Sequence, residues 1–436
     1  MKSLRGALDQ TRAARVPGTE DWAELASSPI DRPLRLRCTT LEIFLLFEPN
    51  KETRVPSLFA TLVRMTAIVL AALIPFTSIA QENDTIKVGA LFAISGPASI
   101  YGRDSEQTLR LLIGEKGATI GGRRVVLTIY DDEGNSTKAA QLFRRLVEKD
   151  EVDVVIGPSI TGTALSVKPL ANQLKIPNLT HGGSHTVTSP ATPYVFGVNP
   201  VDRTVVEHML AVMRDRKVKK VALLYPQDGF GLSGGGQLEE LAPKYGIEVK
   251  HETFAPQDTD MTAQLLRVKD MKPDALVIWG SNPGPSIVLK NAMDLGLKLP
   301  VFLGYGNGTR SFIANTGPAA EGVYVTAMPI IAPETLPEGP QKKLLTDFEA
   351  KYRAKYGVPP DVAAGHTIDS VLILNEALKT IKGPLSHEKL RDAIEAVSFC
   401  GANGCRQFTP EDHRGYGEKF ATVLMQIRGG KWQAPN

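Results

Sequence analysis

Residues 86–102 read IKVGALFAISGPASIYG, and this stretch decides the fold. Its first part, Ile86–Leu91, is a short run of apolar and β-branched residues, which favours a buried β-strand. Gly96 and Pro97 then mark a turn, and an amphipathic pattern over Ser105–Lys116 predicts a helix. The fold is therefore expected to start from a strand, a turn and a helix.

The same unit recurs along the chain. Strands that alternate with helices of this length indicate βαβ units, in which helices cover both faces of a parallel sheet. The further predicted strands are Val125–Tyr130, Val152–Ile156, Val221–Tyr225, Ile247–Thr253, Ala275–Trp279, Pro300–Leu303 and Val323–Ala327, and the further helices are Thr137–Lys149, Thr163–Leu174, Thr204–Arg216, Gly236–Tyr245, Met261–Met271 and Ser286–Leu295. Helices at Gln341–Lys355, Val362–Ile381 and Glu388–Val397 and a strand-like Phe420–Arg428 follow.

The series breaks once, around Asn199–Arg203, where a strand-like Tyr194–Val198 ends and a fresh set of units begins at Val221. A chain of 436 residues also exceeds what one hydrophobic core usually serves. We therefore predict an α/β protein with two doubly wound parallel-sheet lobes. Because open parallel sheets bind ligands beyond the carboxyl ends of their strands, the turns of both lobes should line one crevice.

Composition limits the classes of function. Apolar residues make up 42% of the chain and the formal net charge is +3, which gives no reason to expect nucleic acid as a partner. Of the three cysteines, Cys38 lies in the N-terminal leader, while Cys400 and Cys405 lie close together. This spacing fits neither a disulfide scaffold nor a zinc site, so we expect a local disulfide.

The segment Met65–Phe76 is the one long apolar run. A preceding Arg64 and the small residues Ser78-Ile79-Ala80 complete the pattern of a secretory signal peptide cleaved after Ala80. Residues 1–57 have no sustained periodicity and are expected to be disordered, or to precede the true start of translation. A buried helix or an uncleaved anchor remains the alternative for the apolar run.

Several longer motifs resemble one family. They are IKVGALFAISGPASIYG at 86–102, YDDEGNSTKAAQLFRRLVEKDEVDVVIGP at 130–158, YPQDGFG at 225–231 and FTPEDHRGYG at 408–417 with VLMQIRGGKW at 423–432. In order and spacing they are similar to the periplasmic substrate-binding proteins of branched-chain amino acid type ABC transporters. The resemblance implies a type I periplasmic-binding fold with a three-strand hinge, a periplasmic location, no cofactor, permease subunits as partners and a monomer.

The resemblance also implies lobe boundaries and a site. Lobe 1 would comprise residues 84–203 and 329–416, and lobe 2 residues 204–328 and 417–436. Backbone amides and hydroxyls at a helix start would hold a ligand carboxylate. The expected ligand-binding residues are Tyr101, Ser159, Thr161, His181, Gly183, Ser184, Phe230, Asn282, Tyr305 and Asn307. Thr161 and Ser184 could instead cap their own helices, and Tyr101 and Phe230 could be packing residues.

One turn departs from the family pattern. Where amino-acid binders place an acid to pair with the ammonium group, this chain reads Gly304-Tyr305-Gly306-Asn307-Gly308. A buried ammonium group without an anionic partner is costly, so a zwitterionic amino acid is disfavoured unless another acid reaches in. We therefore expect a carboxylate that lacks an α-amine, such as an aromatic acid. His181, His185 and His366 add possible hydrogen-bond donors.

Two other classes of protein compete with a binding protein. An enzyme is suggested by GFGLSG at 229–234, which matches the spacing of a dinucleotide fingerprint. However, Pro226-Gln227-Asp228 separate this motif from its strand, and no metal-binding or nucleophile motif accompanies it. We expect no enzyme activity, cofactor or metal. A soluble sensor with the same fold is the second alternative.

Overall fold

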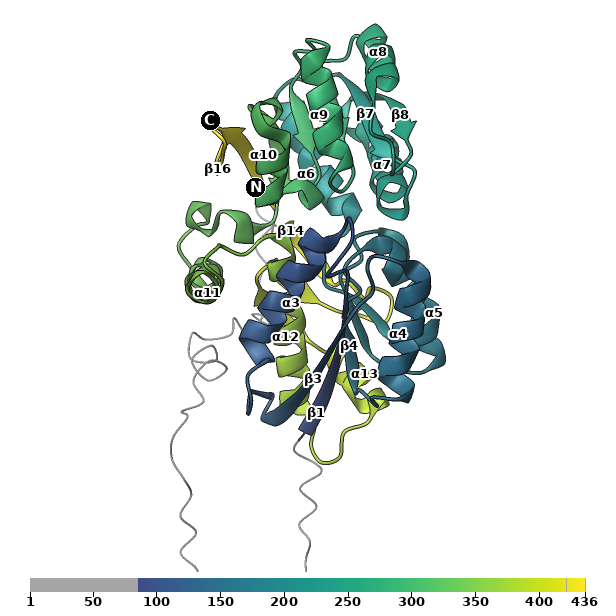
Figure 1. The fold of residues 1–436 in the computed structure, drawn as a ribbon, viewed down its shortest axis with the longest axis vertical. Helices are drawn as coiled ribbons and strands as arrows, with labels where there is room; N and C mark the ends of the chain where they lie inside the picture. Colours follow the sequence, from purple (N-terminus) through teal and green to yellow (C-terminus); the bar gives the residue numbers. More distant parts are fainter. Residues whose placement is uncertain (1–84, 421, 436) are drawn as a thin grey trace, which may run out of the picture. The chain divides into compact units, whose positions relative to one another are not determined.

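Two separate sheets, whose parallel strands follow the same order, organise the molecule (Figure 1). The structure is a computed structural model that describes residues 85–420 and 422–435. The first sheet has the order β2-β3-β1-β4-β5-β6. Its strands are β1 (Thr85–Phe92), β2 (Thr119–Ile120), β3 (Arg123–Asp131), β4 (Val154–Ile156), β5 (Asn178–Thr180) and β6 (Val195–Gly197). All neighbouring pairs are parallel except β2 and β3.

The second sheet has the order β16-β15-β11-β10-β9-β7-β8. Its strands are β7 (Lys220–Pro226), β8 (Glu248–Phe254), β9 (Ala275–Ile278), β10 (Val301–Leu303), β11 (Tyr324–Ala327), β15 (Val423–Arg428) and β16 (Lys431–Gln433). The five strands from β7 to β11 are parallel, and β15 and β16 join antiparallel at the edge. In both sheets the first parallel strand lies between the second and the third. Each sheet therefore has a topological switch point.

Helices connect the strands and cover both faces of each sheet. In Figure 1, α3 and α12 lie on one side of the first sheet and α4 and α5 on the other. The helices are α3 (Ser99–Ile113), α4 (Ser136–Glu148), α5 (Thr161–Gln173), α6 (Asp202–Asp215), α7 (Gly229–Leu241), α8 (Thr262–Met271), α9 (Gly284–Asp294), α10 (Arg310–Thr316), α11 (Pro340–Tyr356), α12 (Val362–Thr380) and α13 (His387–Glu395). This arrangement confirms the predicted α/β fold of two doubly wound lobes.

Strand β1 illustrates why the predicted run is buried. Val88, Ala90 and Phe92 belong to the core cluster that includes α3 and α12, whereas Leu91 belongs to the cluster under α4 and α5. Successive side chains of a strand point to opposite faces, so a strand covered by helices on both sides must be apolar at nearly every position. The sequence IKVGALF meets this requirement.

The chain passes three times between the two sheets, after β6, after β11 and after β14 (Tyr416–Phe420). Strand β14 completes a small antiparallel sheet with β12 (Ser398–Gly401) and β13 (Gly404–Gln407). Cys400 and Cys405 lie opposite each other on β12 and β13 and form a disulfide. These three passages correspond to the three crossings of the predicted fold, and the lobe boundaries stay a prediction.

Two helices begin much earlier than predicted, whereas several others begin only one or two residues earlier. Helix α3 begins at Ser99 instead of Ser105, so Tyr101 lies in its first turn, and α7 begins at Gly229 instead of Gly236. The hairpin β12–β13 was not predicted. The leader, with the proposed cleavage after Ala80, lies outside the described residues. No helix among the described residues combines the length and apolarity needed to cross a bilayer.

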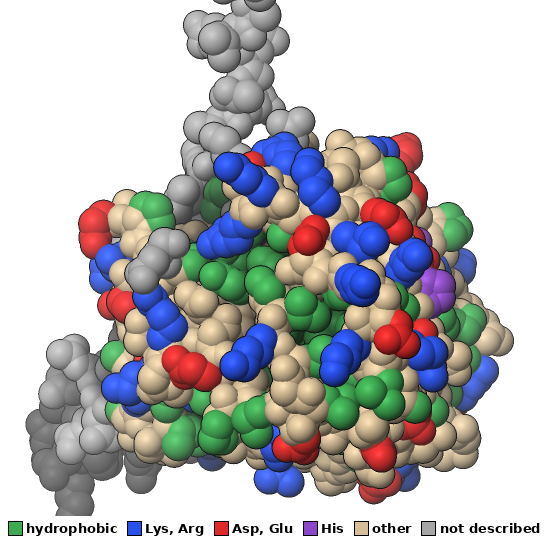
Figure 2. All heavy atoms as spheres, turned by 90° about the horizontal axis from the view of Figure 1, so that it is seen from above, with side chains coloured by type: hydrophobic (Ala, Val, Ile, Leu, Met, Phe, Trp, Pro, Cys, Tyr) green, Lys and Arg blue, Asp and Glu red, His purple; other side chains and the backbone are tan. Residues whose placement is uncertain are grey.

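Charged side chains of both signs are interspersed on the face of the molecule drawn in Figure 2. Ion pairs on helix surfaces include Arg110 with Glu106 and Lys343 with Asp347, each four residues apart. Exposed pairs of this kind contribute little to stability.

Candidate functional site

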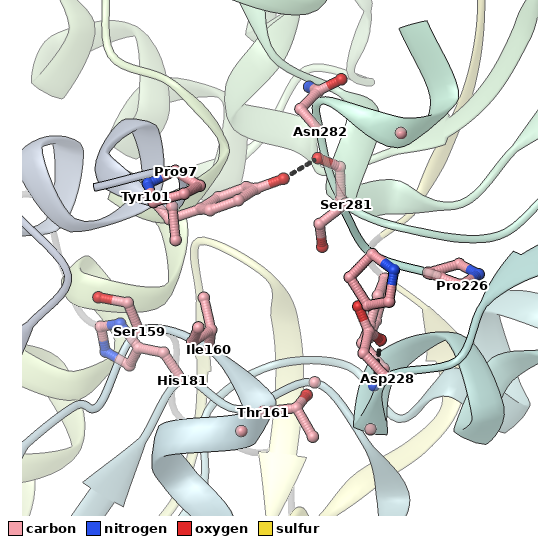
Figure 3. Close-up of a pocket in the computed structure, with 18 of the residues that line it drawn as sticks. Pro97, Tyr101, Ser159, Ile160, Thr161, His181, Pro226, Asp228, Ser281 and Asn282 are labelled. Carbon is pink, nitrogen blue, oxygen red and sulfur yellow. Dashed lines mark hydrogen bonds between the residues drawn. The ribbon is translucent and has the colours of Figure 1, made fainter. Parts of the chain in front are cut away.

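A cavity of about 310 Å³ lies where the carboxyl ends of both sets of parallel strands meet (Figure 3). The turns after β1, β4 and β5 line it from the first sheet, and those after β7, β8, β9 and β10 from the second. This is the position expected for ligands of open parallel sheets. Its lining residues are Pro97, Ala98, Tyr101, Ser159, Ile160, Thr161, Gly162, His181, Gly183, Asn199, Pro226, Asp228, Gly229, Phe230, Phe254, Pro256, Ser281, Asn282, Pro283, Gly284, Tyr305, Gly306, Val362, Ala363 and His366.

Helix α5 directs its first turn at this cavity. Its N-cap Ile160 supplies no side-chain acceptor, so its side chain leaves the amides of the first turn uncapped. The Thr161 hydroxyl accepts a hydrogen bond from the amide of Ser184 at 3.2 Å, which joins the turn after β4 to the turn after β5. The Ser159 hydroxyl accepts one from Ala93 at 3.3 Å. Both hydroxyls thus lie in the wall of the cavity, with hydrogen-bonding capacity remaining.

The electrostatic character of the cavity comes from helix ends. No Lys or Arg is among its lining residues, yet α3, α5, α7, α9 and α12 all begin beside it. A helix N-terminus carries a partial positive charge and exposed N–H groups, which favour an anion. Carboxylates of Asp228 and Asp361 cap α7 and α12, so the positive potential comes mainly from α3, α5 and α9, which have no side-chain cap.

Tyr101 joins the two lobes across the cavity. Its hydroxyl donates to the carbonyl oxygen of Gly306 at 2.8 Å and accepts a hydrogen bond from Ser281 (Figure 3). Burial raises the pKa of Tyr101 to about 12, so the hydroxyl stays protonated and remains a donor at neutral pH. Tyr101 lies on α3 of the first lobe, whereas Ser281 and Gly306 follow β9 and β10 of the second.

A second contact between the lobes involves Gly183. A side chain at this position would overlap the Tyr305 hydroxyl and come within 3.0 Å of the Phe230 ring. Phe230 in turn packs against Trp279 and Tyr305, with ring centroids 5.6 Å apart in both pairs. Only glycine at 183 therefore allows the aromatic residues of the second lobe to approach the turn after β5 this closely.

Asp228 also lies in the wall of the cavity, although it is not among the ligand-binding residues expected from the sequence. Its Oδ1 accepts hydrogen bonds from Phe230 N at 3.0 Å and Gly231 N at 2.7 Å, which makes it the N-cap of α7. Its Oδ2 accepts none from the described residues. Burial raises the pKa of Asp228 above its usual value. An aspartate directly before a Gly-rich helix start is a recognisable N-cap signal, and it could have located this carboxylate.

The structure brings eight of the ten predicted ligand-binding residues together around the cavity, and their role in binding stays a prediction. Ser184 and Asn307 are not among the lining residues. Ser184 caps a short 3₁₀ helix by accepting from Thr186 N, the alternative considered for it. Asn307 donates to the carbonyl oxygens of Gly280 and Gly304 and is fully buried. Both side chains therefore shape the turns behind the wall.

Two glycines of GFGLSG, Gly231 and Gly234, serve helix packing. They lie inside α7, and a side chain at Gly231 would overlap the Pro226 carbonyl, while one at Gly234 would overlap the Trp279 ring. Glycine allows a helix to approach its sheet closely, so this spacing has a structural explanation. Among the described residues, no three His, Cys, Asp or Glu side chains are grouped as metal ligands would be.

Comparison with known proteins identifies the family. Residues 85–431 match the model of a family described as periplasmic binding protein. The Leu/Ile/Val-binding protein homolog 7 of Brucella melitensis is 23% identical over 384 residues, which cover 84% of this chain and 94% of that protein.

Solved structures agree in fold. An extracellular ligand-binding receptor from Rhodopseudomonas palustris HaA2 has a TM-score of 0.74 at 30% identity, covering 80% of this chain and 99% of that one. A solute-binding protein of an ABC transporter from R. palustris, solved in complex with benzoate, has a TM-score of 0.70 at 23% identity, covering 80% and 95%. These matches agree with the two parallel-sheet lobes, and the chain belongs to the family of periplasmic binding proteins of the branched-chain amino acid type.

Proposed function

We propose that this protein is the solute-binding component of an ABC importer and that it captures a small carboxylate lacking an α-amine. The observation that carries the proposal is the start of α5 in the wall of the cavity between the lobes, where α3, α5 and α9 begin without a side-chain cap and no Lys or Arg lines the wall. Such a cavity favours an anion that is small enough to be held by N–H groups and hydroxyls. The helix start at Thr161 and Gly162 is the proposed carboxylate position.

Apolar residues on both sides of the cavity support an aromatic or other apolar body for the ligand. Ile160 and Pro97 contribute from the first lobe, and Phe230 and Pro283 from the second. Ligand cavities commonly combine such walls with a few polar groups that fix orientation. The protein solved with benzoate has the same fold, which makes benzoate a suitable first probe.

Closure of the two lobes is the proposed mechanism. The contacts of Tyr101 with Gly306 and of Gly183 with Tyr305 join opposite lobes, so they exist only while the lobes are close. A ligand can shift the balance between open and closed forms only by binding the closed form better. A molecule held by groups of both lobes satisfies this condition, and permease subunits would recognise the closed form. We propose no enzyme activity and a periplasmic monomer.

An amino acid is the second candidate ligand, and Asp228 is the observation that favours it. This carboxylate reaches the cavity from the second lobe, and Gly229 next to it lies against Thr161, since a side chain at 229 would be 3.1 Å from Thr161 Cγ2. An acid near the proposed carboxylate position could pair with an α-ammonium group. The Brucella relative carries a Leu/Ile/Val-binding name.

Titration calorimetry of the unmodified protein and of Asp228→Asn distinguishes the two ligands. Asn keeps the cap of α7, since its Oδ1 can accept the same two amide hydrogen bonds. We expect benzoate to bind, and Asp228→Asn to strengthen its binding several-fold by removing a negative charge near an anion. Leucine should not bind. Tight leucine binding that Asp228→Asn weakens by about tenfold or more would establish the amino acid instead.

A further inference from the structure

Helix α12 contributes three residues to the cavity wall, namely its first two residues and His366. His366 lies in the second turn of the helix and is 5% exposed. Burial lowers the pKa of His366 well below its usual value, and the nearby Arg406 and Arg414 add to this effect, so the ring is neutral at neutral pH. A neutral imidazole has one N–H donor and one acceptor nitrogen, and its neighbours decide which is which.

Asn403 is the neighbour that decides it. Its side-chain nitrogen lies 3.3 Å from Nδ1 of His366. The same amide is hydrogen bonded to Asp369, whose carboxylate also pairs with Arg406 at 3.0 Å in a fully buried ion pair. A carboxylate in an ion pair only accepts hydrogen bonds, so the donor end of the amide faces Asp369 and His366. Nδ1 of His366 must therefore be the acceptor, and the ring proton must be on Nε2.

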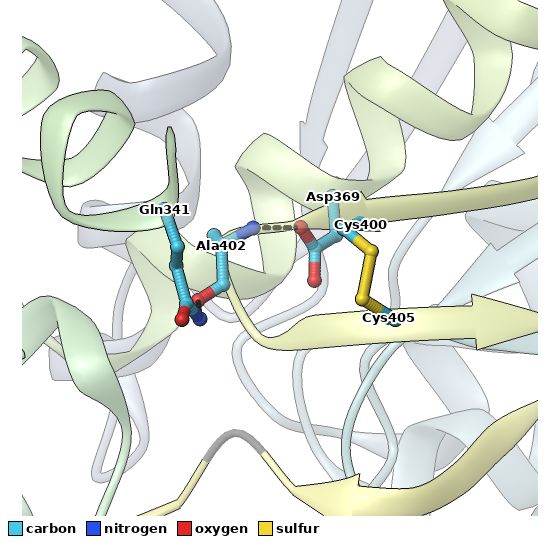
Figure 4. Close-up of a disulfide and its surroundings, with 5 residues drawn as sticks. All are labelled: Gln341, Asp369, Cys400, Ala402 and Cys405. Atoms are coloured by element: carbon cyan, nitrogen blue, oxygen red, sulfur yellow. Dashed lines mark hydrogen bonds between the residues drawn. A yellow bond between two sulfur atoms is a disulfide. The ribbon is translucent and has the colours of Figure 1, made fainter. Parts of the chain in front are cut away.

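The turn that carries Asn403 is fixed by the disulfide hairpin (Figure 4). Cys400 and Cys405 close a turn of four residues, and the amides of Ala402 and Asn403 donate to the two oxygens of Asp369 at 2.6 and 3.1 Å. Gln341 donates to the carbonyl oxygen of Ala402 at 3.0 Å. Asn403 is fully buried. The side-chain amide is thus held in one place from several sides.

His181 is the other histidine that lines the cavity, and its Nε2 already has a hydrogen-bond partner within the protein. Its Nε2 lies 3.0 Å from the Ser370 hydroxyl, which itself donates to the carbonyl oxygen of His366 at 2.9 Å. The Ser370 oxygen therefore accepts a hydrogen bond from Nε2–H of His181, so this N–H group is not free to donate to a ligand. Burial lowers the pKa of His181 to about 3, so it carries no second proton. No hydrogen bond among the described residues occupies Nε2 of His366.

We propose that His366 donates its Nε2–H to an acceptor oxygen of the ligand and that Asn403 is the positioning residue that fixes this tautomer. The inference rests on the proposed function, because it deepens the account of the same cavity. The neutral Nε2–H group of His366 would thus be a second hydrogen-bond donor of the first lobe, in addition to the N–H groups of α5. The ligand would accordingly present an acceptor oxygen to α12.

Nitrogen chemical shifts of ¹⁵N-labelled histidine test the tautomer without any ligand. The signals of His366 are assigned by their loss in His366→Gln. We expect a protonated Nε2 and an unprotonated Nδ1 in the unmodified protein, and a mixture of tautomers in Asn403→Ala. A protonated Nδ1 in the unmodified protein would overturn the proposal. Unchanged shifts in Asn403→Ala would remove the positioning role of Asn403.

Titration calorimetry tests whether His366 donates a hydrogen bond to the ligand. Benzoate is the first probe, and a panel of other small monocarboxylates is tested after it. We expect His366→Leu to weaken binding by about tenfold or more, the usual effect of losing a hydrogen bond to a charged group. His366→Gln, which keeps a donor, should restore most of the affinity. His251→Leu, on the exposed side of β8, is the matched control.

The outcomes separate the two claims. If no acid of the panel binds the unmodified protein, the proposed function fails. If an acid binds and His366→Leu binds it equally well, the function stands and the inference about His366 is wrong. Equal losses in His366→Leu and His366→Gln would also contradict a donor role.

Discussion

Asp202 shows what burial does to a single side chain in this fold. It begins α6, just after the chain leaves the first sheet, and it is fully buried. Burial raises the pKa of Asp202 to about 7, against the opposing effects of Ser233 and Arg414. As the pH rises, the unfolded chain loses the proton of this carboxyl group near its ordinary pKa, whereas the folded protein keeps it up to about pH 7.

Replacing Asp202 by Asn should make the protein more stable at alkaline pH. A raised pKa means that the stabilising contribution of the protonated carboxyl is complete below about pH 4 and is lost as the pH rises through about 7. At pH 8 we expect Asp202→Asn to raise the free energy of unfolding by about 2 to 4 kcal/mol, at about 1.4 kcal/mol per pKa unit. Urea denaturation at pH 4 and pH 8 measures it.

The gain should disappear at pH 4, where the native carboxyl is already protonated. Asp270→Asn, at an exposed position on α8, is the control and should change stability little at either pH. An equal gain at both pH values would mean that the charge of Asp202 is not responsible.

At the residue scale the sequence predicts which residue types line the cavity better than it predicts their contacts. Thr161 follows a predicted strand, so its approach to the cavity follows from topology. Gly183 follows β5, which was not predicted as a strand, and only the family resemblance pointed to it. Ser184 directs its hydroxyl to its own helix start instead, because a cap hydrogen bond is local and always available. His366 was noted only as a possible donor, because its partner Asn403 lies in a hairpin that no periodicity reveals.

At the scale of elements, α7 shows how a helix start can be hidden in the sequence. Its first turns contain four glycines that lower helix propensity, which is why the helix was predicted to begin at Gly236. The Asp228 cap and the close contact of Gly234 with Trp279 stabilise those turns instead. Tertiary packing decides the boundary, whereas strands such as β7 follow directly from their apolar pattern.

Two glycines of α7 should respond to Ala in opposite ways. Gly234→Ala would drive a methyl group into the buried Trp279 ring, so we expect a loss of about 1 to 3 kcal/mol in the free energy of unfolding. Gly236→Ala has open space around its Cβ and should stabilise the protein by about 0.5 to 1 kcal/mol, since Ala favours a helix. Thermal unfolding measures both, and equal effects would contradict this packing account.

At the scale of the whole molecule, the sequence predicts two lobes because the strand–helix series runs twice and breaks once. It cannot predict which atoms join the lobes, because such contacts depend on how two separately folded surfaces meet. The hydrogen bond from Tyr101 to Gly306 is one of these contacts, and Arg310 of the second lobe reaching the carbonyl oxygen of Pro360 at 3.0 Å is another.

Tyr101→Phe keeps the ring in the wall but removes the hydrogen bond between the lobes. We expect the affinity for the bound acid to fall by about two- to tenfold, the usual worth of one neutral hydrogen bond. Because the bond forms only on closure, the loss should lie in faster dissociation, with association unchanged. Stopped-flow kinetics measures both rates. Tyr245→Phe, outside the cavity, is the control, and slower association with unchanged dissociation would contradict the assignment.

The three passages of the chain between the sheets have a consequence for synthesis. Strand β11 needs β15 as its neighbour, and α3 needs α12 as its cover, although both partners come much later in the chain. Contacts so distant in sequence form slowly. A nascent chain that ends before Val423 already contains every residue that lines the cavity but lacks the β15–β16 edge of the second sheet, so the second lobe is completed only by the last residues to be synthesised.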